Sequence, residues 1–456
     1  MPEQLWNTWF ANERKKLNGT ESRDGKRGYI HFDRKIPEPD ETKTKELLSP
    51  VNVAKHSFYP FIRIDTRERR FHRVKGHAPG DQRRERTIKR RPIDFASHKD
   101  AFVFSWYAHL LSTSYEEELT RRGIGNHVIA YRALKNLDGS GKTNIHFAKE
   151  AFDFIEENQP CRVFAIDITK FYEEIDHSLL HQQWSVLAGI TTLPPDHQRV
   201  FEAITDYRFV RKGRIRGLYD RARQQRLPQL CTPKEFQQEV IANHLQEKGC
   251  VGDRTRGIPQ GAPISCVLAN AYMLPFDTAM AAYVATIPKG FYQRYSDDIL
   301  IVCTPEDAQR VIEFATSEIQ KLKLRIKPKK TEHRLFITNE DKTVSLDPTT
   351  NKEAHLQYLG IVTDGQQRLL RHGTVARFQR RRNRGVKKAI NRAALKRKPI
   401  PRKFLRTKYA KPWQNTLSYS KRAGKILNSS NVSKQLSPQK AAGKLEKLIR
   451  QQTKKK

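Results

Sequence analysis

The stretch FYQRYSDDILIVC, residues 291–303, places two adjacent carboxylates inside a run of strand-forming residues. Neighbouring side chains such as Tyr295, Ile299 and Val302 favour a buried, pleated setting. Burial of a bare charge in such a setting is costly. Asp297 and Asp298 therefore either lie in an exposed turn or share a compensating partner. A divalent cation is a suitable partner because Mg²⁺ prefers hard oxygen ligands, including carboxylates.

A third acid, Asp167, ends another short apolar segment, VFAID. Taken alone, Asp167 fits a helix N-cap, because Thr169 and a predicted helix follow it. Two cations held about 3.5–4 Å apart, however, need carboxylates from more than one strand. If the two apolar segments are neighbouring strands, Asp167, Asp297 and Asp298 supply that set. We predict that these three acids converge on a pair of metal ions.

The formal net charge of +37 exceeds what solubility requires and predicts a polyanionic partner. Residues 366–456 hold 29 Lys and Arg but a single acid, Glu446, and so contribute +28 of this charge. Within 374–394, Val375, Phe378, Val386 and Ile390 form a rough apolar stripe that predicts a helix with a cationic face. The last 30 residues also fit a disordered basic tail.

The five cysteines form no CxxC pair, which disfavours a zinc site and predicts free thiols in a reducing compartment. The N-terminal residues lack the apolar core of a signal peptide, and no stretch approaches 18 apolar residues. We therefore expect a cytoplasmic protein with no membrane partner.

Five motifs occur in the order of the palm motifs of reverse transcriptases: VFAIDITKFYEEID, RGIPQGAPIS, RYSDDILIV, IKPKKTE and YLGI. Over about residues 84–365 the chain resembles bacterial members of that family. These include the group II intron and retron enzymes and, most of all, the defence-associated reverse transcriptases of unknown-group or abortive-infection type. The resemblance implies an α+β right-hand polymerase with fingers, a palm built on an antiparallel sheet with helices on one face, and a helical thumb.

The resemblance also implies a domain order. Residues 1–82 would form an N-terminal extension, with little core of its own over 1–50, and the start of the fingers. The fingers would continue over 83–160. The palm would span 161–365 with a helical insert at about 180–250, and 366–456 would form a basic helical thumb and C-terminal tail.

In the resembling enzymes, residues matching Asp167 and Asp297 bind both Mg²⁺ ions, for which Mn²⁺ can substitute. The backbone carbonyl of Ile168 would add an oxygen ligand, and Asp298 would be the weaker or structural partner. Lys330 matches the lysine that assists the leaving pyrophosphate, and Lys329 is the neighbouring alternative.

Nucleotide-binding roles are also implied. Tyr172 matches the aromatic residue that blocks a 2′-hydroxyl, which predicts a DNA product, although a core aromatic is the alternative. Lys89 and Arg91 match residues that clamp the triphosphate, with the adjacent Arg90 as the alternative, and Gln260 lies where it can bond the template or incoming nucleotide. The residues expected to contact primer and template are Pro259, Gly261, Tyr358, Leu359, Gly360, Arg377, Arg380, Arg381 and Arg384.

We therefore predict an RNA-directed DNA polymerase that uses dNTPs to copy a noncoding RNA, giving DNA or an RNA/DNA hybrid, in bacterial antiphage defence. A second copy of the chain or a companion defence protein is a further partner under this interpretation. The alternatives are a template-independent or protein-primed DNA polymerase and a nucleic-acid-binding protein that uses the fold as a scaffold.

Overall fold

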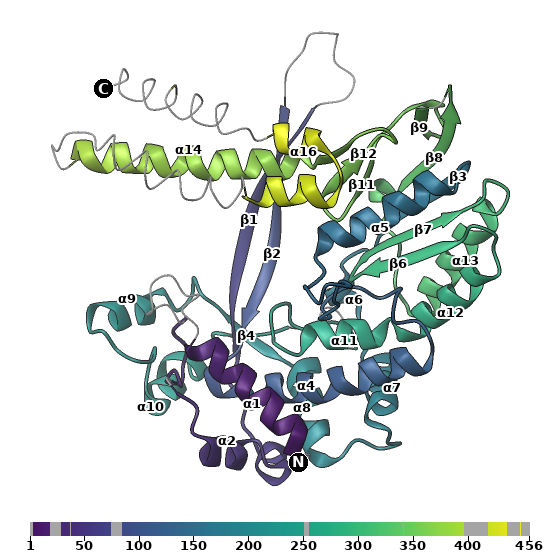
Figure 1. Cartoon of the computed structure of the whole chain (residues 1–456). Helices are drawn as coiled ribbons and strands as arrows, with labels where there is room; N and C mark the ends of the chain where they lie inside the picture. Colours follow the sequence, from purple (N-terminus) through teal and green to yellow (C-terminus); the bar gives the residue numbers. More distant parts are fainter. Residues whose placement is uncertain are drawn as a thin grey trace. The chain divides into compact units, whose positions relative to one another are not determined.

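Helices and strands are mixed throughout the chain (Figure 1). The computed structural model describes residues 3–18, 29–36, 38–73, 84–249, 255–340, 342–395, 418–435 and 447. Unit 1 contains residues 1–125, 169–276 and 319–324, and unit 2 contains 126–168, 277–318 and 325–456. Because each unit combines separate stretches of sequence, the linear division into four domains stays a prediction.

Unit 1 contains a four-stranded sheet in the order β2-β1-β4-β5. The long strands β1 (Phe61–Arg73) and β2 (Arg84–Phe95) pair antiparallel. The short strands β4 (Arg208–Arg211) and β5 (Gln246–Lys248) extend this sheet, with β4 parallel to β1. The prediction of a helical insert at 180–250 missed β4 and β5, because strands of four and three residues are too short to show periodicity.

The helices that lie wholly in unit 1 come from two stretches of sequence, 1–125 and 169–276. They are α1 (Glu3–Asn18), α2 (Glu41–Leu47), α3 (Pro50–Ala54), α4 (His98–Arg121), α6 (Phe171–Glu174), α7 (His177–Ala188), α8 (Pro195–Thr205), α9 (Arg216–Gln224), α10 (Pro233–Phe236) and α11 (Ser265–Tyr272), with a π-helix at Gln237–Ile241.

The N-terminal residues, for which little core of their own is expected, pack against a later helix of unit 1. Trp6 and Trp9 of α1 are buried, and their rings lie 5.7 and 5.4 Å from the ring of Trp106 in α4. Their spacing of three residues puts both rings on one face of the helix. The indole nitrogen of Trp9 also donates to the hydroxyl of Ser105.

Unit 2 is built on a six-stranded sheet in the order β10-β9-β8-β3-β7-β6. Each neighbouring pair is antiparallel, as the resemblance implied for the palm. The strands are β3 (Cys161–Asp167), β6 (Phe291–Tyr295), β7 (Asp298–Cys303), β8 (Glu332–Asn339), β9 (Lys342–Asp347) and β10 (Lys352–Glu353). The predicted apolar strands ending in Asp167 and flanking the paired acids thus occupy the middle and one edge of this sheet.

Helix α5 (Asn144–Glu157) covers one face of the sheet (Figure 1). Its Ile145 and Phe152 belong to the same buried cluster as Val163 of β3 and Val302 of β7. The residues that alternate with these, including Ile166 and Ile301, are buried as well. Burial on both faces explains why these strands read as continuous apolar runs.

The rest of unit 2 comprises a three-stranded sheet and several helices. The sheet contains β11 (Leu356–Tyr358), β12 (Ile361–Thr363) and β13 (Arg368–Leu370). The helices are α14 (His372–Leu395), residues 418–426 and α16 (Ser430–Gln435), while α12 (Leu274–Ala285) and α13 (Ala308–Lys321) each span the boundary of the units. No helix among the described residues is long and apolar enough to cross a membrane.

Candidate active site

The register of β3 against β7 brings the three acids together. Asp167 pairs directly with Asp298 in this antiparallel ladder. Directly opposed residues in such a ladder have α-carbons about 4.5–5.5 Å apart and side chains on the same face. Asp297 lies in the turn between β6 and β7, and its carbonyl accepts a hydrogen bond of 3.3 Å from the amide of Ile168. Acids separated by 130 residues of sequence therefore form one cluster within unit 2.

The three carboxylates repel one another. Partial burial of the Asp298 carboxyl group, together with the negative charges of Asp297 and Asp167, raises its pKa to about 6. The positive charges of Lys330 and Arg371 oppose this shift. Concentrated negative charge of this kind is relieved by a bound cation.

Lys330 places a positive charge in direct contact with Asp167. Its ammonium group donates to both carboxylate oxygens of Asp167, at 2.5 and 2.7 Å. The backbone holds this segment in place, because the amide of Lys327 donates to the carbonyl of Asp167 at 2.8 Å and Ile326 bridges to Ile168. Lys330, predicted to assist the leaving pyrophosphate, thus compensates Asp167 in this state of the protein. The Lys329 side chain lies outside the described residues.

The donor chemistry of this cluster suits Mg²⁺ or Mn²⁺, since both favour carboxylate and carbonyl oxygens. The described residues nevertheless contain no group of three or more His, Cys, Asp or Glu side chains already arranged around a cation position. The ion pair with Lys330 accounts for part of this, because it engages both oxygens of Asp167. The residues that would hold the ions are Asp167, Asp297, Asp298 and the carbonyl of Ile168.

The turn Tyr358–Gly360 joins β11 to β12 and is fixed by its neighbours. Leu359 and Gly360 both have positive φ angles, of 45° and 88°. The side-chain amide of Asn144 donates to the carbonyl of Leu359 at 2.8 Å, and the amide of Arg371 donates to the carbonyl of Gly360 at 3.0 Å. The turn is therefore held from α5 and from the residue that precedes α14.

The prediction that Tyr358 contacts the primer needs correction. Its side chain is buried, and its hydroxyl donates to the side-chain oxygen of Gln293 in β6 at 3.2 Å. Tyr358 thus links the turn to the central sheet, while the half-buried Leu359 and Gly360 remain accessible. Gln293, a buried polar residue of β6, is the detectable sequence signal for this contact; Asn144 offered none.

In unit 1, the loop from Gly257 to Gly261 contacts both Tyr172 and β2. The amide of Ile258 donates to the carbonyl of Tyr172, and the amide of Asp94 donates to the carbonyl of Gln260 at 2.8 Å. Pro259 is buried, so it shapes the loop rather than touching a ligand, whereas Gln260 is exposed. The ring of Tyr172 is half-buried, with its hydroxyl 4.0 Å from the sulfur of Cys266.

Lys89 and Arg91 lie two residues apart on β2, so their side chains point to the same face of the strand. Arg90 points to the other face. Arg91 is exposed and lies 3.7 Å from Glu68, a separation that makes only a weak surface pair. Lys89 and Arg91 can therefore reach one ligand together, whereas Arg90 faces away from it; their binding of the triphosphate stays a prediction.

Helix α14 confirms the predicted cationic helix within the basic C-terminal region. Arg377, Arg380 and Arg384 are exposed, while Val386 and Ile390 are buried. Their spacing of three and four residues places the three arginines along one side of the helix. The side chains of Arg381 and Phe378 lie outside the described residues.

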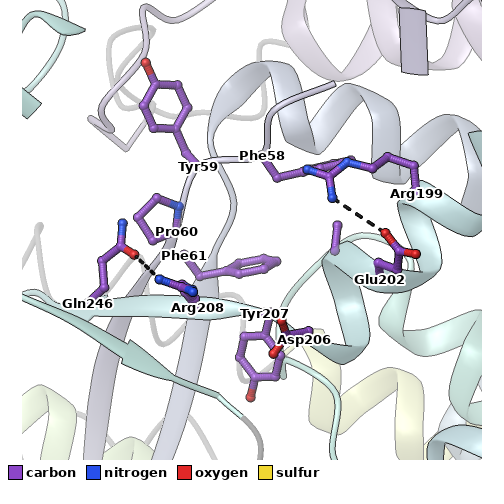
Figure 2. A pocket seen from close by; sticks show the side chains of 11 residues that line it. Phe58, Tyr59, Pro60, Phe61, Arg199, Glu202, Asp206, Tyr207, Arg208 and Gln246 are labelled. Carbon is purple, nitrogen blue, oxygen red and sulfur yellow. Dashed lines mark hydrogen bonds and ion pairs between the residues drawn. The ribbon is translucent and has the colours of Figure 1, made fainter. Parts of the chain in front are cut away.

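Unit 1 also contains a cavity of about 330 Å³ beside the start of β1, α8 and β4 (Figure 2). Its wall combines aromatic rings with polar groups that already have partners: Arg199 lies 3.7 Å from Glu202, and Arg208 donates to Gln246 at 3.4 Å. None of the residues predicted to bind nucleotide lines it.

Residues 126–363 match the profile of the family described as reverse transcriptase (RNA-dependent DNA polymerase), which is more than half of the chain. The chain belongs to the reverse transcriptase family. This membership confirms the predicted enzyme class, a nucleotidyltransferase, and agrees with the α+β right-hand polymerase class.

Among solved structures, this reverse transcriptase is similar to two apo telomerase structures from Candida tropicalis, one truncated from its C-terminal domain. Each is 9% identical with a TM-score of 0.38, and the similarity covers 72% and 74% of this chain. The chain spans 59% and 54% of the length of those telomerase chains. No curated protein sequence matches it significantly.

Gly261 offers a test of the loop beside β2. Its φ of 120° and the position of its absent Cβ, 2.9 Å from the carbonyl oxygen of Asp94, require glycine. We expect Gly261→Ala to lower the free energy of unfolding by about 1–3 kcal/mol, measured by urea unfolding. Gly217→Ala is the control, because no atom lies within 4 Å of its Cβ position in α9. Equal effects of both substitutions would contradict the close approach of this loop to β2.

Proposed function

We propose that this reverse transcriptase synthesises DNA on an RNA template by metal-dependent phosphoryl transfer at Asp167, Asp297 and Asp298. The observation that carries this proposal is the direct pairing of Asp167 with Asp298 across β3 and β7 in a chain of this family. The three acids supply oxygen ligands at one end of β3 and β7, where two ions could brace the attacking and leaving oxygens.

Two Mg²⁺ ions, when bound, would favour deprotonation of the primer 3′-hydroxyl and neutralise the developing charge on the triphosphate. The protein's part is positional. Asp167 and Asp297 would hold the ions, Asp298 would add a weaker ligand, and the carbonyl of Ile168 would complete the set. Lys330, which bonds Asp167, would assist the leaving pyrophosphate by donating to a phosphate oxygen.

The nucleotide would be selected by unit 1. The half-buried ring of Tyr172 would exclude a 2′-hydroxyl, and the exposed Gln260 would bond the template or the incoming nucleotide. Lys89 and Arg91, on one face of β2, would bind the triphosphate, with the guanidinium of Arg91 able to bond two oxygens at once. Gly261 would permit close approach of the loop to a base pair.

Primer and template would contact unit 2 at two places. Leu359 and Gly360 present a fixed turn to the primer end, supported from beneath by Tyr358. Arg377, Arg380, Arg381 and Arg384 of α14 would contact phosphates, which gives affinity without reading sequence.

The finer assignment rests on the motif resemblance. Over about residues 84–365 the five motifs together most resemble those of bacterial defence-associated reverse transcriptases, which supports a noncoding RNA template, a cytoplasmic location and an antiphage role. A second copy or a companion defence protein would be a partner in that setting.

Two rival functions differ in what they need. A template-independent or protein-primed polymerase uses the same acids without an annealed primer, and a scaffold protein uses only the basic surface. Purified chain is incubated with dNTPs, with and without RNA, and the product is treated with protease. Synthesis that requires RNA and survives protease supports the proposal. Synthesis without RNA supports the template-independent polymerase. A product that is lost on protease treatment supports the protein-primed polymerase, and no synthesis supports the scaffold protein.

Asp297→Asn tests the catalytic assignment. Loss of one metal ligand should abolish dNTP incorporation, whereas RNA affinity, which comes from basic residues elsewhere, should stay nearly unchanged. Primer extension and filter binding measure the two properties. Asp220→Asn, an exposed substitution of the same kind on α9, is the control and should retain activity. Continued synthesis by Asp297→Asn would refute the metal assignment.

Replacing Arg377, Arg380 and Arg384 by Gln tests the role of α14. Binding to RNA should weaken uniformly across sequences, and the slope of log affinity against log salt should flatten by up to about 0.9 per lost phosphate contact. The control replaces three exposed arginines on other helices, Arg121, Arg216 and Arg310, so that the same charge is removed. An equal change in both triple variants would place the nucleic acid elsewhere.

A further inference from the structure

A fully buried ion pair lies beneath the turn that carries the paired acids. Asp277 of α12 and Arg294 of β6 are both 0% exposed. The Nε and Nη2 atoms of Arg294 donate to the two carboxylate oxygens of Asp277 at 2.7 and 2.6 Å. The hydroxyl of Tyr292 donates to the same carboxylate at 2.5 Å. All three residues belong to unit 2.

The third nitrogen of this guanidinium reaches the turn itself. Nη1 of Arg294 donates to the carbonyl oxygen of Ser296 at 3.0 Å. Ser296 has a φ of 59°, in the left-handed region that residues other than glycine seldom adopt, so this turn needs support from its surroundings. Arg294 provides it from below, and its own backbone is fixed by hydrogen bonds with His127 and Ile129.

The hydrogen bond to Ser296 acts directly on Asp297. The carbonyl of Ser296 and the amide of Asp297 share one planar peptide group, so fixing the oxygen fixes the plane that enters Asp297. The peptide plane that leaves Asp297 is held by the amide of Ile168, which donates to the Asp297 carbonyl. The backbone of Asp297 is thus held on both sides, once from the buried arginine and once from the strand that carries Asp167.

Stability alone gives a weak reason for such a pair. The cost of removing two charges from water roughly offsets their attraction, and apolar replacements of similar volume are often equally stable. What an apolar pair cannot provide is a donor directed at the Ser296 carbonyl. The planar guanidinium can bond Asp277 through two nitrogens and Ser296 through the third, an arrangement that the single ammonium of lysine cannot reproduce.

We propose that Arg294, locked by Asp277, is a positioning residue that sets the backbone of Asp297 for cation binding opposite Asp167. This inference rests on the proposed function for the identity of the cation ligands. It adds that the affinity of the acid cluster for a divalent cation depends on a buried pair that touches no substrate.

The first test compares Arg294→Lys with the unaltered chain. Mn²⁺ is the probe, and electron paramagnetic resonance measures the concentration of the free ion. The Mn²⁺ that the Asp297→Asn variant binds is subtracted as background. We expect Mn²⁺ affinity to fall by about 10-fold, a usual effect of removing a residue that orients a metal ligand. The Mg²⁺ concentration that half-saturates dNTP incorporation should rise by a similar factor.

Arg368→Lys is the matched control. Arg368 is also largely buried in unit 2, and it pairs with Asp153 and Glu156 at 2.7 and 2.8 Å. Its substitution weakens an ion-pair network without touching the turn, so thermal stability should fall while Mn²⁺ affinity stays unchanged. A loss of Mn²⁺ affinity equal to that of Arg294→Lys would assign the effect to general destabilisation and overturn the inference.

A second variant separates folding from positioning. Tyr292→Phe, Asp277→Leu and Arg294→Met together replace the whole polar cluster by apolar groups, so that no charge is left buried without a partner. Circular dichroism should show a folded chain, and Mn²⁺ affinity should again fall by about 10-fold. A folded triple variant with unchanged Mn²⁺ affinity would overturn the inference, even if Arg294→Lys fails to fold.

The outcome is independent of polymerase activity. If the unaltered chain incorporates no dNTP on RNA but Mn²⁺ affinity responds as expected, the proposed function fails and the positioning role stands. If the chain is an active polymerase and its Mn²⁺ affinity is unchanged by substitution of Arg294, the positioning role fails and the proposed function stands.

Discussion

The antiparallel pairing of β3 with β7 is the constraint on which the active site depends. A shift of this register by one residue would turn the carboxylate of Asp298 to the opposite face from that of Asp167. The register is fixed by the apolar residues of both strands, which are buried on both faces and packed on one of them by α5. Burial makes paired charge costly in these strands. The same burial fixes the register that places Asp167 opposite Asp298.

Charge balance is the second requirement of this arrangement. Three carboxylates at one end of a buried sheet repel each other, and the raised pKa of Asp298 reflects both partial burial and this repulsion. Lys330 bonds Asp167, and Arg371 adds positive charge near Asp298. Arg371 also donates its amide to Gly360. Arg371 thus both lowers the negative charge around Asp298 and holds, through its backbone, the turn that is expected to contact the primer.

Much of this site could be predicted from sequence because its parts are continuous motifs. Strands around Asp167, Asp297 and Asp298 are long apolar runs, and the cationic face of α14 follows a helical period. The short strands β4 and β5 could not be predicted, since β4 forms by pairing with the distant β1 and β5 by pairing with β4. The burial of Tyr358 and the support of its turn by Asn144 depend on partners distant in sequence. Tyr358 bonds the side chain of Gln293, and Asn144 bonds the backbone carbonyl of Leu359.

Anomalous diffraction from crystals of the protein with an RNA template, a DNA primer ending in a dideoxynucleotide, a dNTP and Mn²⁺ tests the central claim most directly. The account predicts two Mn²⁺ peaks about 3.5–4 Å apart, bridged by carboxylate oxygens of Asp167 and Asp297, with the primer end beside one of them. A bound primer and nucleotide with the ions away from these acids would contradict it.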